Sequence, residues 1–276
     1  MRKRIIITGA TSGIGEATAI ALANEKYHLI LGVRNIEKAQ KLVDKLSKEN
    51  NDAKIDIHKL DLSSLGSIKG FADNIHKSYD SIDILFNNAG VFVDKKAYSK
   101  EGYELTLGVN YIGTYYLTKL LLDIIETGEN PQIINIGSRA GLFGKFKLKK
   151  DAFTIQKPGF RAYSASKYLQ LQTSIYLSKY LNTDVKLNVV HPGDAATGIW
   201  NGDSILMKLI GPIMKKTLKS SAEAAVAGLY LVENPPTESG KFYQNLGEEL
   251  SFDKYDEDFA KSVIEETDRM IAEHND

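Results

Sequence analysis

A glycine-rich turn directly follows a short apolar run near the N-terminus, and this junction limits the chain to few folds. The run Ile5–Ile7 leads into Thr8–Gly15, which reads TGATSGIG, and apolar residues then recur with helical spacing. This order predicts a buried strand, a tight turn and a helix. Glycines let a turn approach a ligand closely, and a helix N-terminus offers free N–H groups to a phosphate. A plain tight turn would also use glycines, but the strand–turn–helix setting favours a dinucleotide site.

Short apolar runs alternate with longer amphipathic stretches along most of the chain. The expected strands are Ile5–Ile7, His28–Val33, Ala53–Leu60, Ile82–Phe86, Gln132–Ile136 and Val185–Val190. The expected helices are Gly13–Asn24, Ile36–Lys48, Ile68–Tyr79, Glu101–Glu126 and Tyr163–Tyr180. Strands joined through helices favour right-handed crossovers and a parallel sheet. The sequence therefore predicts one α/β domain over residues 1–276, a doubly wound Rossmann fold whose central parallel sheet of about seven strands is flanked by helices.

Three regions depart from this alternation. Residues 139–160 are basic and rich in phenylalanine, and residues 201–219 also lack the strand–helix pattern. Long excursions in a compact domain are usually functional, so we expect both to be substrate loops that cover the pocket, with the lysines of the first solvated. An acidic stretch at about 253–272 predicts a C-terminal surface helix. The alternatives are that this helix closes the active site or joins a subunit interface. Its inward-facing residues are expected to be Phe259, Val263 and Met270.

The composition excludes several classes of function. Lys plus Arg and Asp plus Glu both number 35, so the formal net charge is +0. Nucleic acids and anionic membranes select positively charged surfaces, so neither is expected as a partner. Without cysteine there are no disulfides, catalytic thiolates or Cys-ligated metals, and the five histidines form no metal-ligand motif, so no metal site is expected. No apolar stretch reaches the length of about 18 residues that a membrane span needs, and we expect a cytoplasmic protein.

Six further motifs follow the glycine-rich turn in a fixed order. They are Asp61-Leu62, Asn87-Asn88-Ala89-Gly90, Val109-Asn110, Ser138, Tyr163 with Lys167, and Pro192-Gly193 with Thr197. Together with the T-G-x-x-x-G-x-G turn, this set resembles the short-chain dehydrogenase/reductase family from Thr8 to Thr197. Any one of the motifs can arise by chance, whereas the ordered set is very specific.

The resemblance implies an oxidoreductase that interconverts a ketone or aldehyde and an alcohol by hydride transfer with a nicotinamide dinucleotide. The implied catalytic residues are Tyr163 as general acid/base, Ser138 as donor to the substrate oxygen, Lys167 as support for the tyrosine, and Asn110 as anchor of a water. The expected cofactor-binding residues are Gly9, Thr11, Ser12, Gly13, Ile14, Gly15, Arg34, Asn35, Asp61, Leu62, Asn88, Ala89, Gly90, Tyr163, Lys167, Pro192, Gly193 and Thr197.

The pattern Y-x-x-x-K occurs twice, so by itself it does not locate a catalytic site. Tyr115 with Lys119 and Tyr163 with Lys167 each place a phenol and an ammonium one helical turn apart. In either pair the cation would favour the phenolate. Only the second pair follows Ser138 and the fifth expected strand, so we assign the chemistry to it. The first pair is interpreted as packing plus a solvated lysine.

The end of the second expected strand indicates which dinucleotide is bound. A site that prefers NAD places an acidic residue there to accept the adenosine ribose hydroxyls. Here Val33 occupies that position, Arg34 and Asn35 follow, and no acid appears before Glu37. Arg34 can pair with a 2′-phosphate through two charge-assisted hydrogen bonds, so NADP(H) is expected in preference to NAD(H). The alternative is that Arg34 merely begins the next helix on the surface.

The long interval between Ser138 and Tyr163 narrows the resemblance. The chain resembles the retinol-dehydrogenase-like and protochlorophyllide-reductase-like branch of the family in three places: this interval, residues 139–162, and the segments Leu31–Asn35 and Val109–Gly113. That branch often carries an N-terminal membrane anchor and none is expected here, so a retinoid substrate is not implied. Large apolar residues in the two excursions indicate an apolar small-molecule carbonyl or alcohol substrate: Phe143, Phe146, Trp200 and Met207. The resemblance also implies a homodimer or homotetramer formed through the long helices.

Two functions other than carbonyl reduction are found in proteins with a similar fold. A non-catalytic redox sensor would bind the dinucleotide with the same fold, but it would not need the four catalytic residues together. A nucleotide-sugar epimerase relative shares Y-x-x-x-K, yet it usually has a T-G-x-x-G-x-x-G turn and a larger C-terminal substrate domain. The glycine spacing of this turn and the short chain after Thr197 weigh against the epimerase.

Overall fold

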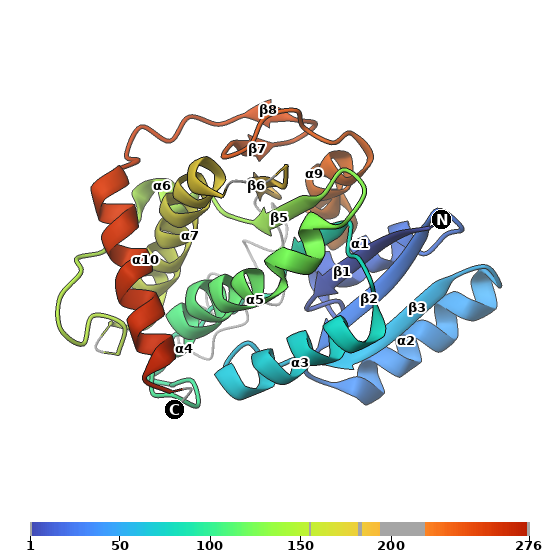
Figure 1. Cartoon of the computed structure of the whole chain (residues 1–276), viewed down its shortest axis with the longest axis horizontal. Coiled ribbons are helices and arrows are strands. Elements are labelled where there is room, and N and C mark those ends of the chain that lie inside the picture. The colour runs from blue at the N-terminus through green and yellow to red at the C-terminus, as the bar shows by residue number, and fades with distance from the viewer. Residues whose placement is uncertain (1, 155, 182–183, 194–218, 275–276) are drawn as a thin grey trace.

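The computed structural model describes residues 2–154, 156–181, 184–193 and 219–274 (Figure 1). The strands are β1 (Lys3–Thr8), β2 (Tyr27–Val33), β3 (Lys54–Lys59), β4 (Ile84–Asn87), β5 (Gln132–Ile136), β6 (Lys186–His191), β7 (Phe242–Gln244) and β8 (Glu248–Glu249). The helices are α1 (Gly13–Leu22), α2 (Ile36–Glu49), α3 (Leu65–Ser78), α4 (Leu105–Leu107), the π-helical η1 (Gly108–Gly113), α5 (Thr114–Glu126), α6 (Ala140–Phe143), α7 (Phe160–Tyr180), α9 (Ser221–Glu233) and α10 (Glu257–Ala272).

The strands form one sheet in the order β3-β2-β1-β4-β5-β6-β7-β8. Neighbours from β3 to β7 pair in parallel, and the two-residue strand β8 pairs with β7 in the antiparallel direction. The strand order reverses between β1 and β4, which is where a doubly wound sheet opens a crevice beyond its carboxyl ends. The predicted Rossmann fold and its parallel sheet of about seven strands are confirmed. Strand β8 is an addition that the sequence pattern did not predict.

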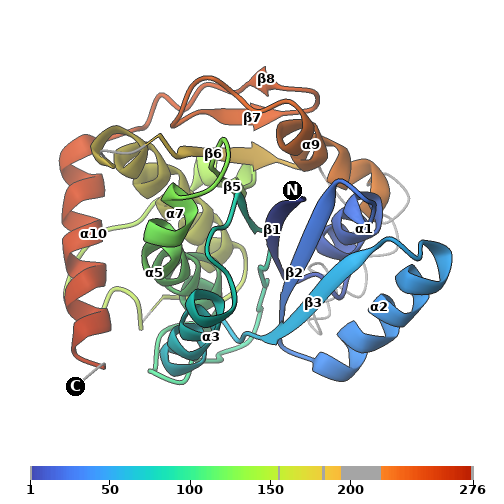
Figure 2. The same cartoon turned by 45° about the vertical axis from the view of Figure 1, so that its right-hand side comes forward.

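Helices cover both faces of the sheet (Figures 1 and 2). Successive residues of a strand point to opposite faces, and β1 shows the consequence. Ile5 and Ile7 pack in the cluster that contains apolar residues of α1, α2 and α9. Ile6 packs in the cluster that contains those of α3, α5 and α7. All three side chains are fully buried, so the apolar run in the sequence is a strand covered on both sides.

The helix expected over Glu101–Glu126 is shorter and is not α-helical throughout. It begins at Leu105 and contains the π-helical segment η1 between α4 and α5. At the end of η1, a Cβ on Gly113 would lie 2.3 Å from the carbonyl oxygen of Leu62. Glycine therefore lets this helix touch the loop after β3, which carries two of the predicted cofactor-binding residues.

Residues 139–160 are packed more closely than an open loop would be. They begin with the short helix α6, and Phe153 stacks on Tyr111 with ring centroids 6.0 Å apart. Phe146 packs against Phe153 at 4.9 Å. Phe143 and Phe160 are by contrast 72% and 54% exposed. The predicted loop 201–219 lies outside the described residues except for Lys219.

The C-terminal helix α10 begins at Glu257, four residues later than the predicted start. Val263 and Met270 are buried, and Phe259 packs against the same core cluster, so the predicted inward face is confirmed. In both views α10 lies at the edge of the molecule beside α7 and α5 (Figures 1 and 2).

Candidate functional site

The glycine-rich turn between β1 and α1 has the conformation that close approach to a ligand requires. Gly9 and Gly13 have positive φ angles of 69° and 57°. A Cβ on Gly9 would lie 2.9 Å from the Cα of Ala89, and one on Gly15 would lie 2.5 Å from the carbonyl oxygen of Gly9. Side chains at these positions would therefore displace the turn.

The start of α1 is open to a ligand. Ser12 is the N-cap residue, but its side chain makes no capping hydrogen bond. The first N–H groups of a helix have no partner within the helix, and they carry the positive end of the helix dipole. A phosphate group bound against this end would supply the missing acceptors.

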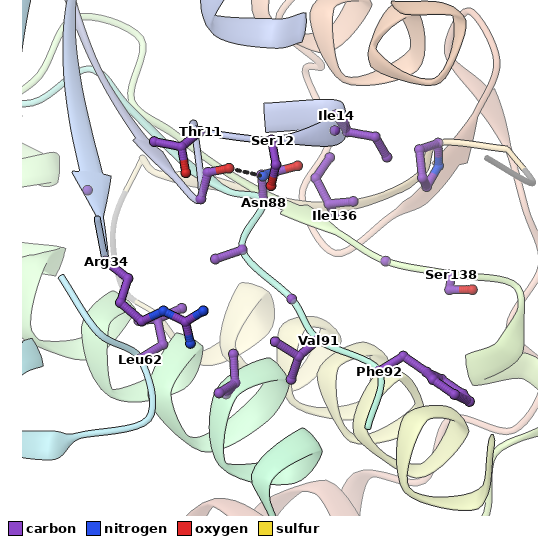
Figure 3. Close-up of a pocket in the computed structure, with 18 of the residues that line it drawn as sticks. Thr11, Ser12, Ile14, Arg34, Leu62, Asn88, Val91, Phe92, Ile136 and Ser138 are labelled. Atoms are coloured by element: carbon purple, nitrogen blue, oxygen red, sulfur yellow. Dashed lines mark hydrogen bonds between the residues drawn. The ribbon is translucent and has the colours of Figure 1, made fainter. Parts of the chain in front are cut away.

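Asn88 joins the segment after β4 to this turn. Its side-chain Nδ2 donates to the carbonyl oxygens of Thr8 at 2.9 Å and of Gly9 at 3.4 Å (Figure 3). The hydroxyl of Thr8 in turn accepts hydrogen bonds from the backbone N–H groups of Asn88 and Ala89. These bonds fix two crossover loops on either side of the point where the strand order reverses.

A cavity of about 630 Å³ opens at these loops. It runs from Arg34 and Leu62 past the turn to Ser138 and Phe92 (Figure 3). Its volume lies within the range of about 300–1,000 Å³ that is usual for ligand sites. The predicted residues that line it are Gly9, Thr11, Ser12, Gly13, Ile14, Arg34, Asn35, Asp61, Leu62, Asn88, Ala89, Gly90, Ser138, Tyr163, Lys167, Pro192 and Gly193.

Two predicted residues that the structure describes are not part of that wall: Gly15 lies beneath the turn, and Asn110 is buried behind the loop that follows β4. The predicted Thr197 lies outside the described residues. No described residue of the 139–160 segment lines the cavity, so this part of the chain does not show the expected lid.

The charged groups of the described cavity wall favour an anion at the end of β2. Arg34 and Lys38 are exposed there, and Asp61 is the one carboxylate among the described lining residues. The carboxylate of Asp61 accepts hydrogen bonds from the backbone N–H and the hydroxyl of Ser63. Asn35 caps α2 by accepting from the N–H of Lys38 at 2.8 Å. The sequence analysis missed Lys38, although its position one helical turn after Arg34 is a usable signal.

Helix α7 brings Tyr163 and Lys167 to the opposite end of the cavity. They are only 7% and 5% exposed, and the ring of Phe92 meets the Tyr163 ring edge-on at 5.8 Å. The Nζ of Lys167 donates to the carbonyl oxygen of Ile136 at 2.6 Å. Burial lowers the pKa of Lys167 to about 8, because desolvation penalises the charged form.

Ser138 follows β5 on the same side of the cavity. Its Oγ accepts a hydrogen bond from the N–H of Ala140 at 3.1 Å, at the start of α6. That bond holds the side chain without using its hydroxyl hydrogen, which is the atom that a developing negative charge would require.

Asn110 lies in η1 and acts on the cavity indirectly. Its Oδ1 accepts from the N–H of Val91 at 2.7 Å, and its Nδ2 donates to the Val91 carbonyl oxygen at 2.9 Å and to Ser166 Oγ at 3.2 Å. The side chain therefore clamps the loop that carries Val91 and Phe92, two lining residues that the sequence analysis did not identify.

The first Y-x-x-x-K pair, Tyr115 with Lys119, has a different environment. The hydroxyl of Tyr115 donates to Asp268 Oδ1 at 2.8 Å, and Lys119 forms an ion pair with Asp268 Oδ2 at 2.7 Å. Burial and the Asp268 carboxylate both raise the pKa of Tyr115, which keeps this phenol protonated. Tyr115 is buried and the Lys119 side chain is 53% exposed, as predicted, and the contacts with Asp268 additionally join this pair to α10.

Neither a metal-ligand cluster nor a membrane-spanning helix occurs in the described part of the chain. No group of three or more His, Asp or Glu side chains in the described part of the chain is arranged to hold a metal ion. None of the described helices has both the length and the apolar character needed to cross a membrane.

Comparisons with known proteins agree on one family. The short chain dehydrogenase family profile matches residues 3–204. Human retinol dehydrogenase 13 is 32% identical over 280 residues, which cover 98% of this chain and 85% of the relative.

Solved structures show the same fold at lower identity. A Mycobacterium paratuberculosis protein superposes with a TM-score of 0.77 at 22% identity and covers 98% of this chain and 93% of its own. A Shigella flexneri protein determined as a complex with NADP has a TM-score of 0.70 at 22% identity, and the match covers 88% of this chain and 96% of its own.

Proposed function

Because this chain belongs to the short-chain dehydrogenase family and is therefore an oxidoreductase, we propose that it interconverts a ketone or aldehyde and an alcohol with NADP(H). One observation carries the proposal: Ser138, Tyr163 and Lys167 line the same cavity as the glycine-rich turn. A hydride donor and a proton donor must reach adjacent atoms of one carbonyl group, so a shared cavity is the first requirement.

The residues of the cavity suit NADP(H). The first N–H groups of α1, which have no partner within the helix, would hold a pyrophosphate, and Arg34 with Lys38 would hold the 2′-phosphate. The Shigella flexneri protein of the same fold binds NADP, which supports this assignment. When bound, NADPH supplies the hydride. The remaining proposed contacts follow the cofactor from the phosphates to the nicotinamide. The phosphates would contact Thr11, Ser12, Gly13, Ile14 and Asn35, and the adenine would contact Asp61 and Leu62. Asn88, Ala89 and Gly90 would lie beside the turn, Tyr163 and Lys167 at the nicotinamide ribose, and Pro192, Gly193 and Thr197 at the nicotinamide.

The proposed chemistry assigns one role to each polar group. Tyr163 donates its proton to the substrate oxygen as the carbonyl carbon is reduced, and it takes that proton back in the direction of alcohol oxidation. The hydroxyl of Ser138 donates a hydrogen bond to the same oxygen. The Lys167 ammonium favours the phenolate that Tyr163 leaves behind. Asn110 is proposed to position Val91 and Phe92, which revises its expected role as the anchor of a water.

The proposed substrate is an apolar carbonyl compound or alcohol. The side chains of Val91, Phe92, Val109 and Ile136 line the cavity. The relative retinol dehydrogenase 13 is named for an apolar alcohol, which supports the same class here. The expected contributions of Trp200 and Met207 fall outside the described residues. A cytoplasmic location stays a prediction from the sequence.

Replacement of Tyr163 by Phe tests the function. Tyr163→Phe removes the proton donor and keeps the ring, so turnover should fall by at least ~10²-fold, while NADP⁺ binding measured by calorimetry is retained. A panel of apolar ketones, aldehydes and alcohols with NADPH or NADP⁺ supplies the assay. Tyr115→Phe, in the other Y-x-x-x-K pair, is the matched control and should turn over like the parent. Near-normal turnover of Tyr163→Phe would refute the proposal.

A further inference from the structure

A buried amide lies next to the ammonium group of Lys167. The Oε1 of Gln170 accepts a hydrogen bond from Lys167 Nζ at 3.3 Å, in addition to the bond from Nζ to the carbonyl oxygen of Ile136. An ammonium offers three N–H donors and no acceptor, so the amide must present its oxygen to it. With two donors used on the interior side, the third is left for the cavity that Lys167 lines.

Gln170 separates Lys167 from a second, much smaller cavity. That cavity, of about 20 Å³, is lined by hydroxyl and amide groups that include Thr114, Asn135 and Thr173. Its two described phenols belong to Tyr111 and Tyr115, whose pKa values are raised chiefly by burial, so both are neutral. No carboxylate occurs among the described residues of its wall.

The ionisable groups on the other side of Lys167 are few. Tyr163 lies one turn earlier on α7, and His191 at the end of β6 lines the same cavity wall. The end of β5 offers Lys167 the carbonyl oxygen of Ile136, and Ser138, two residues later, contributes a hydroxyl to the cavity wall. Arg34 lies at the opposite end of the cavity (Figure 3), and Asp61 and Lys38 also belong to the cavity wall.

We propose that Gln170 is a positioning residue whose amide oxygen holds the Lys167 ammonium in place and in its charged form, so that Tyr163 remains an effective acid. This inference rests on the proposed role of Lys167. Burial alone would favour a neutral amine, and a hydrogen bond to the charged form opposes that tendency. Since the pKa of Lys167 is lowered to about 8, a modest change in its surroundings alters its charge in the neutral range.

Two substitutions at Gln170 should shift the titration of Lys167 in opposite directions. Gln170→Leu removes the acceptor and should weaken proton binding by Lys167 about tenfold, because hydrogen bonds to charged groups are among the stronger ones. Gln170→Glu adds a negative charge and should strengthen it by at least as much. A merely structural role would disturb the site in the same direction in both variants.

The direct measurement is NMR titration of cofactor-free protein carrying lysine labelled with ¹³C at Cε. The signal that disappears in Lys167→Arg identifies the residue. The alkaline limb of the kcat/KM profile should move with the titration midpoint, to lower pH in Gln170→Leu and to higher pH in Gln170→Glu. Gln172→Glu is the matched control: Gln172 lies on the same helix, but its amide bonds to the backbone of Lys254 and Asp256.

The outcomes separate this inference from the proposed function. Unchanged Lys167 midpoints in folded Gln170→Leu and Gln170→Glu would overturn the inference even if turnover still depended on Tyr163. Absence of any Tyr163-dependent turnover in the parent would overturn the proposed function, and the midpoints would still decide whether Gln170 holds the ammonium. If Gln170→Leu does not fold, Gln170→Met takes its place as the variant without an amide oxygen, because the added charge of Gln170→Glu raises the midpoint by itself.

Discussion

Two cations at the carboxyl end of β2 are the residues that would distinguish NADP(H) from NAD(H). Arg34 and Lys38 line the same end of the cavity, and Asn35 fixes the backbone between them. Arg34→Ala should weaken NADP(H) binding by ~1.5–3 kcal/mol, the range for a hydrogen bond to a charged group, and should barely change NAD(H) binding. Calorimetric titration with both cofactors measures this difference. Lys41→Ala, in α2 but not among the described residues of the cavity wall, is the control, and equal losses for the two cofactors would refute the assignment.

Glu104 is a buried carboxyl group that the mechanism does not use. It caps α4 by accepting from the N–H of Leu107 at 2.9 Å, and burial raises its pKa although backbone N–H groups oppose the shift. A carboxyl whose pKa is raised by folding stabilises the protein at low pH, and that stabilisation is lost as the pH rises through the folded-state pKa. Ionisation of Glu104 therefore opposes folding at neutral pH.

The variant Glu104→Gln keeps an acceptor for the cap and removes the charge. The free energy of unfolding of this variant, minus that of the parent, should become more positive as the pH rises above the usual pKa of a glutamate side chain. Urea denaturation at each pH measures this difference. Glu104→Ala removes the cap as well and should cost about 1 kcal/mol. A difference between Glu104→Gln and the parent that does not change with pH would show that this carboxyl group titrates normally.

At the scale of elements, α10 depends on one carboxylate that binds both members of the non-catalytic Y-x-x-x-K pair. Asp268→Ala would leave the buried Tyr115 hydroxyl without its acceptor and should lower the free energy of unfolding by about 1–3 kcal/mol. Lys119→Ala should cost less than about 1 kcal/mol, because that ion pair is largely exposed. Hydrogen exchange of α10 peptides should rise in Asp268→Ala and stay unchanged in Lys261→Ala on the outer face. Unchanged exchange in Asp268→Ala would contradict the anchoring role.

The elements that sequence analysis predicted are those whose signals are local. The turn Thr8–Gly15 requires glycine at fixed positions, and buried strands such as Ile5–Ile7 are apolar without interruption, so both can be identified from a few adjacent residues. Choosing Tyr163 over Tyr115 needed only the order of motifs along the chain. The catalytic and cofactor roles themselves stay predictions, although the structure brings most of those residues to one cavity.

The features that were missed depend on contacts between distant segments. The π-helical turn η1 accompanies the clamp of Asn110 on Val91, 19 residues away in sequence. Asp268 lies 153 residues from Tyr115, and no spacing rule connects them. Strand β8 has only two residues and forms because a turn folds it back onto β7. Periodicity cannot predict such pairings, because they are selected by tertiary packing.

On the scale of the whole molecule, α10 covers the helices through which the family resemblance implies subunit contact. It lies along α7 and α5 (Figures 1 and 2). Gln172 of α7 accepts from the N–H of Asp256 at 3.0 Å, and Thr267 bonds the hydroxyl of Tyr111 in η1 at 3.0 Å. The outer face of α10 is exposed and charged, with Glu257, Asp258, Lys261 and Glu265. Charged residues are depleted from the cores of protein interfaces, so this face is poorly suited to pair with a second copy.

The packing of α10 therefore favours a monomer over the homodimer or homotetramer that the resemblance implies. Light scattering coupled to size-exclusion chromatography should give the mass of one chain, 30.6 kDa, at all concentrations tested. The same experiment should give a different result for Asp268→Ala. Loosening α10 would expose apolar residues of α5 and α7, so the measured mass of this variant should rise with protein concentration. A parent protein that keeps two or four times the chain mass on dilution would contradict this prediction, and subunit contacts would then have to include the outer face of α10 or another surface.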